Sequence, residues 1–113
     1  TIFGFDPDLI LEIKNKKIFI NKRKIVNKLS PKVFLENFIK KFNFHIPSSL
    51  PPMSVMLSGY LGYDIIRYFE KIPDNNIDDL NIPDVKLIRP NFTYIHDNQN
   101  FDLDTFFLKK LDL

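Results

Sequence analysis

The stretch that decides the fold is Gly59-Tyr60-Leu61-Gly62-Tyr63-Asp64-Ile65-Ile66-Arg67-Tyr68-Phe69-Glu70, which holds two of the three glycines in the chain. The segment just before it, residues 53–57, is short and mostly apolar, as is typical of a buried strand. After the second glycine, Ile65, Ile66 and Phe69 recur at helical spacing, and Asp64 is placed to cap the first turn. The segment is therefore predicted to form a strand, a tight glycine turn and a helix.

The two glycines of this stretch allow two interpretations. Without a Cβ, the backbone can turn sharply or approach another element closely, which indicates a packing junction. A ligand-facing loop is the alternative, although Gly-x-x-Gly alone is a weak motif. We favour the packing junction, in which Asp64 and Arg67 have the spacing of an i, i+3 ion pair. The candidate structural or interface residues are Gly59, Tyr60, Gly62, Tyr63, Asp64 and Arg67.

The size and composition of the chain are those of one globular domain. The chain has 113 residues, an apolar fraction of 44% and twelve Phe, which suffice for a core. It has no Cys, which excludes disulfides and thiolate metal sites. No apolar run approaches the roughly 18 residues that span a bilayer, and no basic and then apolar leader opens the chain. We expect a cytoplasmic protein without membrane contact.

Both ends of the chain suggest a piece of a larger protein. It begins with Thr1 rather than Met, and residues 1–5 resemble the inside of a strand. Residues 111–113 end without a closing element. A partial domain should leave apolar surface uncovered, which usually marks an interface.

A basic segment lies near the start of the chain. Two interpretations are open, a patch that binds nucleic acid or another anion, and a solvated hairpin. We favour the hairpin, because Phe19 is the only aromatic residue there that could stack on a base. Nucleic acid is thus not an expected partner. The six basic residues of this Lys14–Lys24 segment are Lys14, Lys16, Lys17, Lys22, Arg23 and Lys24.

The first half of the chain is predicted to form strands and then a helix. Residues 3–5 read as a strand that ends in a turn at Asp6-Pro7. Residues 9–20 read as a β-hairpin of open turn type, with a short third strand at 24–26. Ser30-Pro31 is a helix start, and the apolar stripe that follows predicts a helix over residues 31–42.

The second half is predicted to be mostly strands and loops. Residues 44–52 form an irregular connection, and 71–83 a surface loop in which Asp78-Asp79 could start a half-turn of helix. Strands are expected at 85–88 and 92–96, interrupted at Arg89-Pro90-Asn91 by a bend, a bulge or an edge, because Pro90 cannot donate to a ladder. Beyond residue 100, a short helix capped by Asp104 and running to Lys110 and a strand over residues 101–104 are both open. The fold class is α/β (α+β), a mostly antiparallel sheet with two main helices.

The sequence contains no recognisable catalytic or metal-binding motif. His45 and His96 are far apart, and both are interpreted as surface or loop residues rather than ligands. Asp74, Asp78 and Asp79 lack the Gly and the terminal Glu of a calcium loop. Neither Gly-x-Ser-x-Gly nor a phosphate-binding Gly-x-x-x-x-Gly-Lys occurs. We therefore assign no catalytic, cofactor-binding or metal-binding residue.

Several spaced blocks nevertheless resemble one family, the N-terminal domain of anthranilate synthase component I. The glycine block is shared with a sister family, aminodeoxychorismate synthase component I of the folate pathway, which is kept as an alternative. The blocks are Leu50-Pro51-Pro52-Met53, residues 59–73, residues 79–84, Arg89-Pro90 and the opening residues 3–10.

The resemblance implies a function for the parent enzyme. Such an enzyme is a lyase that converts chorismate, with ammonia from a glutamine amidotransferase subunit, to anthranilate and pyruvate in tryptophan biosynthesis. It uses Mg²⁺, and tryptophan is its feedback inhibitor. In this family the chorismate and Mg²⁺ site lies in a C-terminal domain, which is expected to be absent from this chain. Residues 1–113 are thus expected to be a partial N-terminal domain with a structural or regulatory role, inactive alone.

Overall fold

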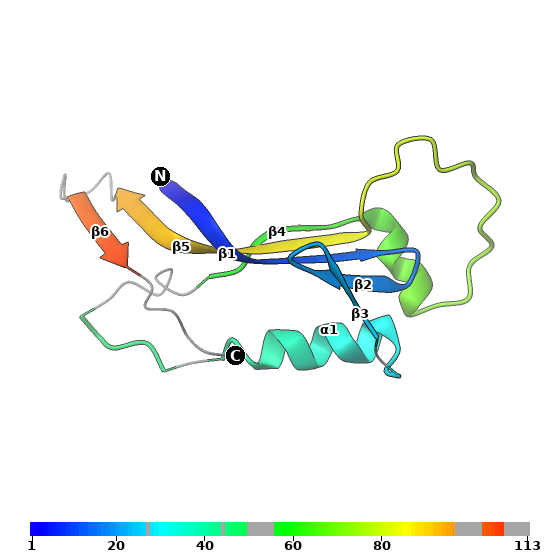
Figure 1. Ribbon diagram of the computed structural model, residues 1–113, viewed down its shortest axis with the longest axis horizontal. Helices are drawn as coiled ribbons and strands as arrows, with labels where there is room; N and C mark the ends of the chain where they lie inside the picture. The colour runs from blue at the N-terminus through cyan, green and yellow to red at the C-terminus, as the bar shows by residue number, and fades with distance from the viewer. Residues whose placement is uncertain (27, 44, 50–55, 97–102, 108–113) are drawn as a thin grey trace.

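The computed structural model describes residues 1–26, 28–43, 45–49, 56–96 and 103–107, and Figure 1 shows their arrangement. The strands form one antiparallel sheet in the order β3-β2-β1-β5-β4, with β6 also paired to β5. This sheet confirms the expected fold class, and the part of the chain that the structure describes adds one α-helix and one 3₁₀ helix beside it. The strands are β1 (Ile2–Lys14), β2 (Lys17–Ile20), β3 (Arg23–Ile25), β4 (Ser58–Leu61), β5 (Val85–His96) and β6 (Leu103–Phe107), and the helices are α1 (Pro31–Lys40) and η2 (Tyr63–Tyr68).

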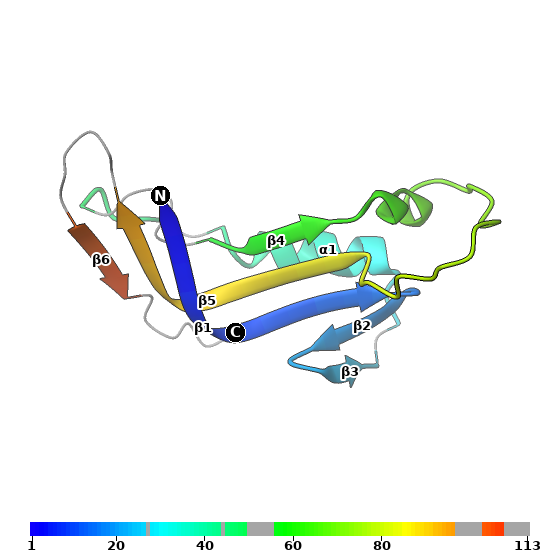
Figure 2. The same cartoon turned by 90° about the horizontal axis from the view of Figure 1, so that it is seen from above.

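The central pair of strands, β1 and β5, is longer than predicted. The predicted turn at Asp6-Pro7 is wrong, because β1 continues through its proline. The predicted strands at 85–88 and 92–96 are one strand, β5, and the bend or bulge expected at residues 89–91 is present in it. Pro7 pairs directly with Pro90, and the register shifts between Pro7 and Leu9 as in a β-bulge. Two residues without an N–H face each other there, so few ladder bonds are lost. The strands bend at this point instead of ending (Figure 2).

The predicted hairpin is present, and its turn type is now defined. Asn15 and Lys16 have φ values of 48° and 62°, and Asn21 and Lys22 have values of 50° and 66°. Two central residues with positive φ make a type I′ turn, which matches the twist of paired strands. The third strand, β3, starts one residue earlier than the predicted residues 24–26.

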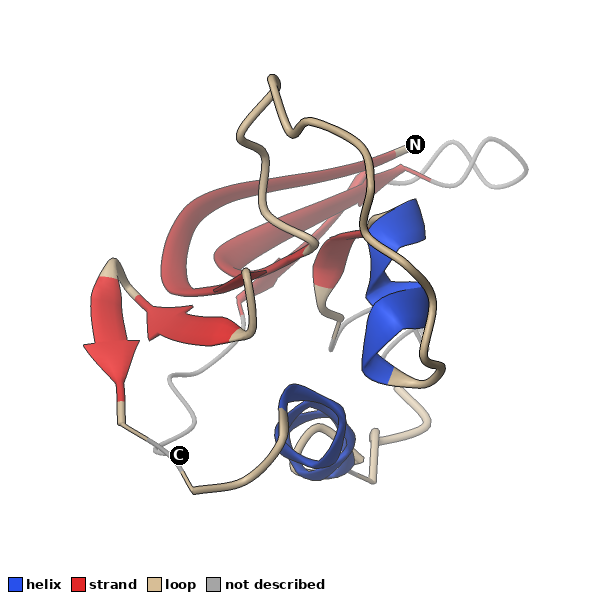
Figure 3. Ribbon diagram, turned by 90° about the vertical axis from the view of Figure 1, so that its right-hand side faces the viewer, coloured by secondary structure: helices blue, strands red, loops and turns tan. Residues whose placement is uncertain are grey.

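Helix α1 covers one face of the sheet, as Figures 1 and 3 show. Ser30 is its N-cap as predicted, accepting a bond from the backbone N–H of Val33 at 3.4 Å. Leu35 and Phe38 are buried against the strands. The helix ends at Lys40, two residues before the predicted end. The core consists of Leu9, Leu11, Ile13, Ile18, Leu35, Phe38 and Val85.

The glycine stretch forms a strand and a helix, but the strand lies later than predicted and the helix begins earlier. The strand is Ser58–Leu61, so Gly59 lies inside it rather than in a turn, while residues 53–55 of the predicted strand lie outside the described residues. The helix is a 3₁₀ helix whose N-cap is Gly62, with no side-chain capping bond. The predicted capping role of Asp64 is therefore wrong.

The remaining segments also differ from expectation in part. Residues 71–84 carry no helix, so the half-turn at Asp78-Asp79 is not formed. Of the two alternatives left open at the end of the chain, residues 103–107 form the strand, and the helix from Asp104 is wrong over that range. Residues 101–102 of the expected strand and 108–110 of the expected helix lie outside the described residues. Among the described residues, no helix has the length and apolar character needed to cross a bilayer.

Candidate functional site

Gly59 allows β4 to lie against β5. It pairs with Leu87 and has a φ of 157°, a conformation that side-chain-bearing residues rarely adopt. A Cβ at this position would lie 1.8 Å from the backbone oxygen of Lys86, far inside van der Waals contact. Close approach between strands thus requires glycine here.

Gly62 makes a second close contact, at the end of the same strand. Its N–H donates to the backbone oxygen of Asp84 at 2.7 Å. A Cβ on Gly62 would lie 3.1 Å from that oxygen, a tight but less severe contact than at Gly59. Its φ of −68° is one that any residue adopts. Gly62 therefore serves close packing rather than a left-handed turn.

Asp84 bonds to three elements at once. Its backbone oxygen accepts from Gly62, its N–H donates to the backbone oxygen of Ile13 at 2.8 Å, and its carboxylate accepts from the Tyr68 hydroxyl at 2.6 Å. These contacts join the residue before β5 to the residue after β4, to β1 and to η2. Burial raises the pKa of Tyr68 strongly, and the bond to Asp84 and the charge of Asp84 raise it further, while a backbone bond with Lys16 acts in the opposite direction.

The predicted Asp64–Arg67 ion pair is present in η2. Arg67 also reaches Asp74, with 3.4 Å between its Nη2 and Oδ1 of Asp74. The side chains of Asp64 and Asp74 are 56% and 69% exposed, so each pair contributes less than about 1 kcal/mol. Arg67 therefore links η2 to the loop that follows it, and its ion pairs add little to the free energy of unfolding.

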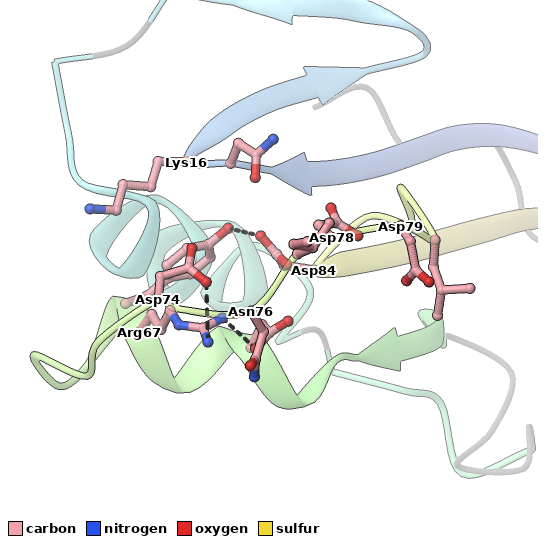
Figure 4. A pocket seen from close by; sticks show the side chains of 12 residues that line it. Lys16, Arg67, Asp74, Asn76, Asp78, Asp79 and Asp84 are labelled. Atoms are coloured by element: carbon pink, nitrogen blue, oxygen red, sulfur yellow. Dashed lines mark hydrogen bonds and ion pairs between the residues drawn. The ribbon is translucent and has the colours of Figure 1, made fainter.

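A polar cavity of about 280 Å³ lies between η2, the β1–β2 turn and this loop (Figure 4). Arg67 and Asp74 point toward one another in it. Most of its carboxylates already bond to the chain. Besides the bonds of Asp64, Asp74 and Asp84 given above, Asp78 accepts from the N–H of Asn81 at 3.0 Å. The described residues contain no group of three His, Cys, Asp or Glu that could hold a metal ion. The charged residues that line the cavity are Lys16, Asp64, Arg67, Asp74, Asp78, Asp79 and Asp84.

The two tyrosines among the candidate residues face solvent rather than this cavity. Tyr60 is 41% exposed on β4, and Tyr63 is 89% exposed at the start of η2. Leu61 between them is 56% exposed. The six candidates thus divide into two glycines at a packing junction, one ion pair and two exposed aromatic side chains.

Sequence reasoning missed two polar contacts that hold this region. One is Tyr68 with Asp84, and the other is Asp8 with Arg89, whose two bonds measure 2.8 and 2.6 Å. Both residues of the second pair have side chains only 11% exposed. Tyr68, Asp84 and Arg89 stand inside the resembling blocks, but nothing in their spacing names their partners, since Asp8 and Arg89 are separated by 81 positions.

The basic segment lies partly beside acidic residues. Lys14 bonds to the Asn81 side chain, and Lys16 lines the polar cavity with the carboxylates named above. Lys17, Lys22, Arg23 and Lys24 are exposed. His45 is exposed and lies outside helices and strands, and the His96 side chain lies outside the described part of the structure.

Comparison with known proteins gives one consistent result, although no family model matches the chain. Anthranilate synthase component 1 of Cereibacter sphaeroides is 33% identical over 104 residues, which cover 86% of this chain and 21% of that protein. The protein of the same name from Thermus thermophilus is 24% identical over 98 residues, covering 87% of this chain and 21% of the relative.

A solved structure supports the same assignment at the level of the fold. Anthranilate synthase component I from Streptococcus pneumoniae TIGR4 superposes with a TM-score of 0.76 over 94% of this chain and 23% of that one, at 22% identity. The chain thus spans about a fifth of the length of the curated relatives that it matches. Sequence and fold together show that this chain belongs to the anthranilate synthase component 1 family.

Proposed function

We propose that this chain is a non-catalytic N-terminal layer of an anthranilate synthase component 1. The observation that carries the proposal is the 33% identity to the Cereibacter sphaeroides protein over 86% of the chain. The described residues of the polar cavity supply hydrogen bonds and ion pairs to one another, which fits a structural role.

The exposed surface supports a layer that packs against something larger. The chain exposes 8770 Å², whereas a compact monomer of 13.4 kDa exposes about 6500 Å². Its radius of gyration is 16.6 Å, against about 13 Å for a compact domain of this length. Large apolar side chains account for part of this surface, Phe3 and Phe5 being 61% and 47% exposed. Such surface usually marks an interface.

The parent protein would convert chorismate and ammonia to anthranilate and pyruvate, in the cytoplasm, as a lyase of tryptophan biosynthesis. In this proposal Mg²⁺ and chorismate bind in the remaining four-fifths of the protein, and a glutamine amidotransferase subunit supplies the ammonia. The word "component" in the relatives' names fits a protein that works with another subunit. Tryptophan would act as feedback inhibitor, with this layer taking part in the response.

A fluorescence assay for anthranilate tests the proposal. The intact polypeptide, given chorismate, ammonium and Mg²⁺, is expected to produce anthranilate, and residues 1–113 alone are expected to produce none. Turnover by the isolated chain would contradict the non-catalytic role. An intact polypeptide that consumes chorismate without forming anthranilate would contradict the assignment to the tryptophan pathway and favour the folate-pathway enzyme.

A further inference from the structure

The two outer strands of the sheet differ in how they are protected against pairing with another strand. At one edge, β3 carries Arg23 and Lys24, and charged side chains on an edge strand discourage pairing with another strand. At the other edge, β4 consists of Ser58, Gly59, Tyr60 and Leu61, with no charge, no proline and no bulge. Within the described residues, β4 pairs with β5 alone.

All four residues of β4 are exposed, although the strand belongs to the sheet. Gly62 donates its N–H to Asp84, toward β5. Because backbone groups alternate in direction along a strand, the N–H and C=O of Leu61 point the opposite way, toward the open edge. The edge thus offers backbone hydrogen-bonding groups to an added strand.

An apolar groove of about 410 Å³ begins beside β4, where β1 and β5 bend. Its apolar lining includes Ile2, Phe5, Met56, Ile88 and Pro90. Figure 2 shows β4 running alongside β5, next to that bend. An unprotected edge beside an apolar groove is suited to a strand whose alternate side chains are apolar.

We propose that β4 is extended by a β-strand from the part of the parent polypeptide that lies outside these 113 residues. The length of the relatives favours this origin of the added strand. The matched 104 residues make up only 21% of the Cereibacter sphaeroides relative, so a parent of similar length has many residues that could pair with β4. The inference rests on the proposed function in one respect, namely that this chain is one layer of such a longer protein.

Amide hydrogen exchange tests the added strand directly. In residues 1–113 alone, the Leu61 amide is expected to exchange quickly and the Gly62 amide slowly. In the intact polypeptide, Leu61 should exchange about 100-fold more slowly, because a hydrogen-bonded strand amide is protected by its pairing. The Gly62 amide is an internal control, since its bond to Asp84 is present in both proteins.

A substitution pair separates edge pairing from general surface effects. Leu61→Lys in the intact polypeptide should restore fast exchange along β4, because a charge on an edge strand opposes pairing. Leu80→Lys, a matched change at a leucine that is 74% exposed in the loop before β5, should leave that exchange unchanged. Equal effects of the two substitutions would contradict the proposal.

Two further outcomes would overturn it. If Leu61 exchanges equally fast in both proteins, the edge is open and no strand is added. If Leu61 of the isolated chain is already protected and the chain sediments as a dimer, a second copy is the occupant. Neither outcome depends on whether the intact polypeptide forms anthranilate, so failure here is distinct from failure of the proposed function.

Discussion

At the scale of single residues, Asp84 is the main connection between the candidate site and the core. Its backbone and carboxylate together bond to Gly62, Ile13 and Tyr68. The Tyr68 bond is half-buried and has an ionised acceptor, and such bonds contribute about 1.5–3 kcal/mol. Removing the Tyr68 hydroxyl should therefore weaken the junction more than any change at the exposed tyrosines.

Tyr68→Phe should lower the free energy of unfolding at neutral pH by about 1.5 kcal/mol. The folded protein keeps the Tyr68 proton at pH values where the unfolded chain loses it, because burial and Asp84 raise its pKa. This stabilisation is complete below the ordinary tyrosine pKa of about 10 and is lost as the pH rises above it. Wild type and variant should therefore converge in alkaline urea titrations, whereas Tyr63→Phe should match wild type throughout.

The two glycines should differ in their tolerance of a side chain. Gly59→Ala places a Cβ against the Lys86 oxygen in a strained backbone, so it should cost about 3 kcal/mol of unfolding free energy. Gly62→Ala needs Asp84 to move only slightly and should cost about 1 kcal/mol. Thermal unfolding of the two variants measures the difference, and equal losses would show that β4 relaxes around the added methyl group.

At the scale of elements, the hairpins show how local chemistry and pairing combine. Asn21 is a favourable residue for a type I′ turn. Its side chain accepts from the Ile10 N–H at 2.9 Å and donates to the backbone oxygen of Asp8 at 3.2 Å. Lys22 beside it has a φ of 66°, which costs a lysine more than a glycine. The turn is therefore held by its strands against a local preference.

Lys22→Gly should raise the free energy of unfolding by about 0.5 kcal/mol, because relief of the left-handed conformation exceeds the added entropy of the unfolded chain. Lys24→Gly is the matched control. It removes the same charge from the same segment but places glycine in extended β3, where it should cost about 1 kcal/mol. Urea unfolding of both variants checks the opposite signs, and two losses would contradict the turn assignment.

At the scale of the whole molecule, the chain is more open than its mass requires. Its surface exceeds that of a compact monomer by about a third. The bend at Pro7 and Pro90 divides the long strands into two arms, of which α1 covers one (Figure 2). In the proposed function, such an open layer would gain stability by packing against a further body, the rest of the parent protein.

The distribution of charge argues against nucleic acid as that body. The net charge is only +2, and Lys14 and Lys16 lie beside the acidic loop. Because phosphate contacts release counterions, true binding would fall steeply with salt. A salt titration of the isolated chain against DNA and RNA should show weak binding without a steep salt dependence. A slope of log affinity against log salt that corresponds to several phosphate contacts would instead support the anion-patch interpretation.

Helix α1 and the β1–β2 hairpin could be predicted from the sequence because their causes are local. Ser30 and Pro31 mark a helix start, and Asn15 marks a turn, whatever the rest of the chain does. The junction could be predicted only in part. Gly59 and Gly62 pointed to close packing, but β5, which they approach, lies more than twenty residues further along the chain.

The sequence by itself pointed to the family, through its spaced blocks. It also determined the antiparallel class and the local elements, because periodicity, caps and turn residues act between near neighbours. Only the tertiary structure decided that β1 and β5 run through their prolines, that Asp8 meets Arg89, and that β4 forms an unprotected edge. Each of these depends on which distant segment lies alongside. Pairing across the sheet depends on the packing of the whole chain, and short-range sequence patterns do not specify which distant segments pair.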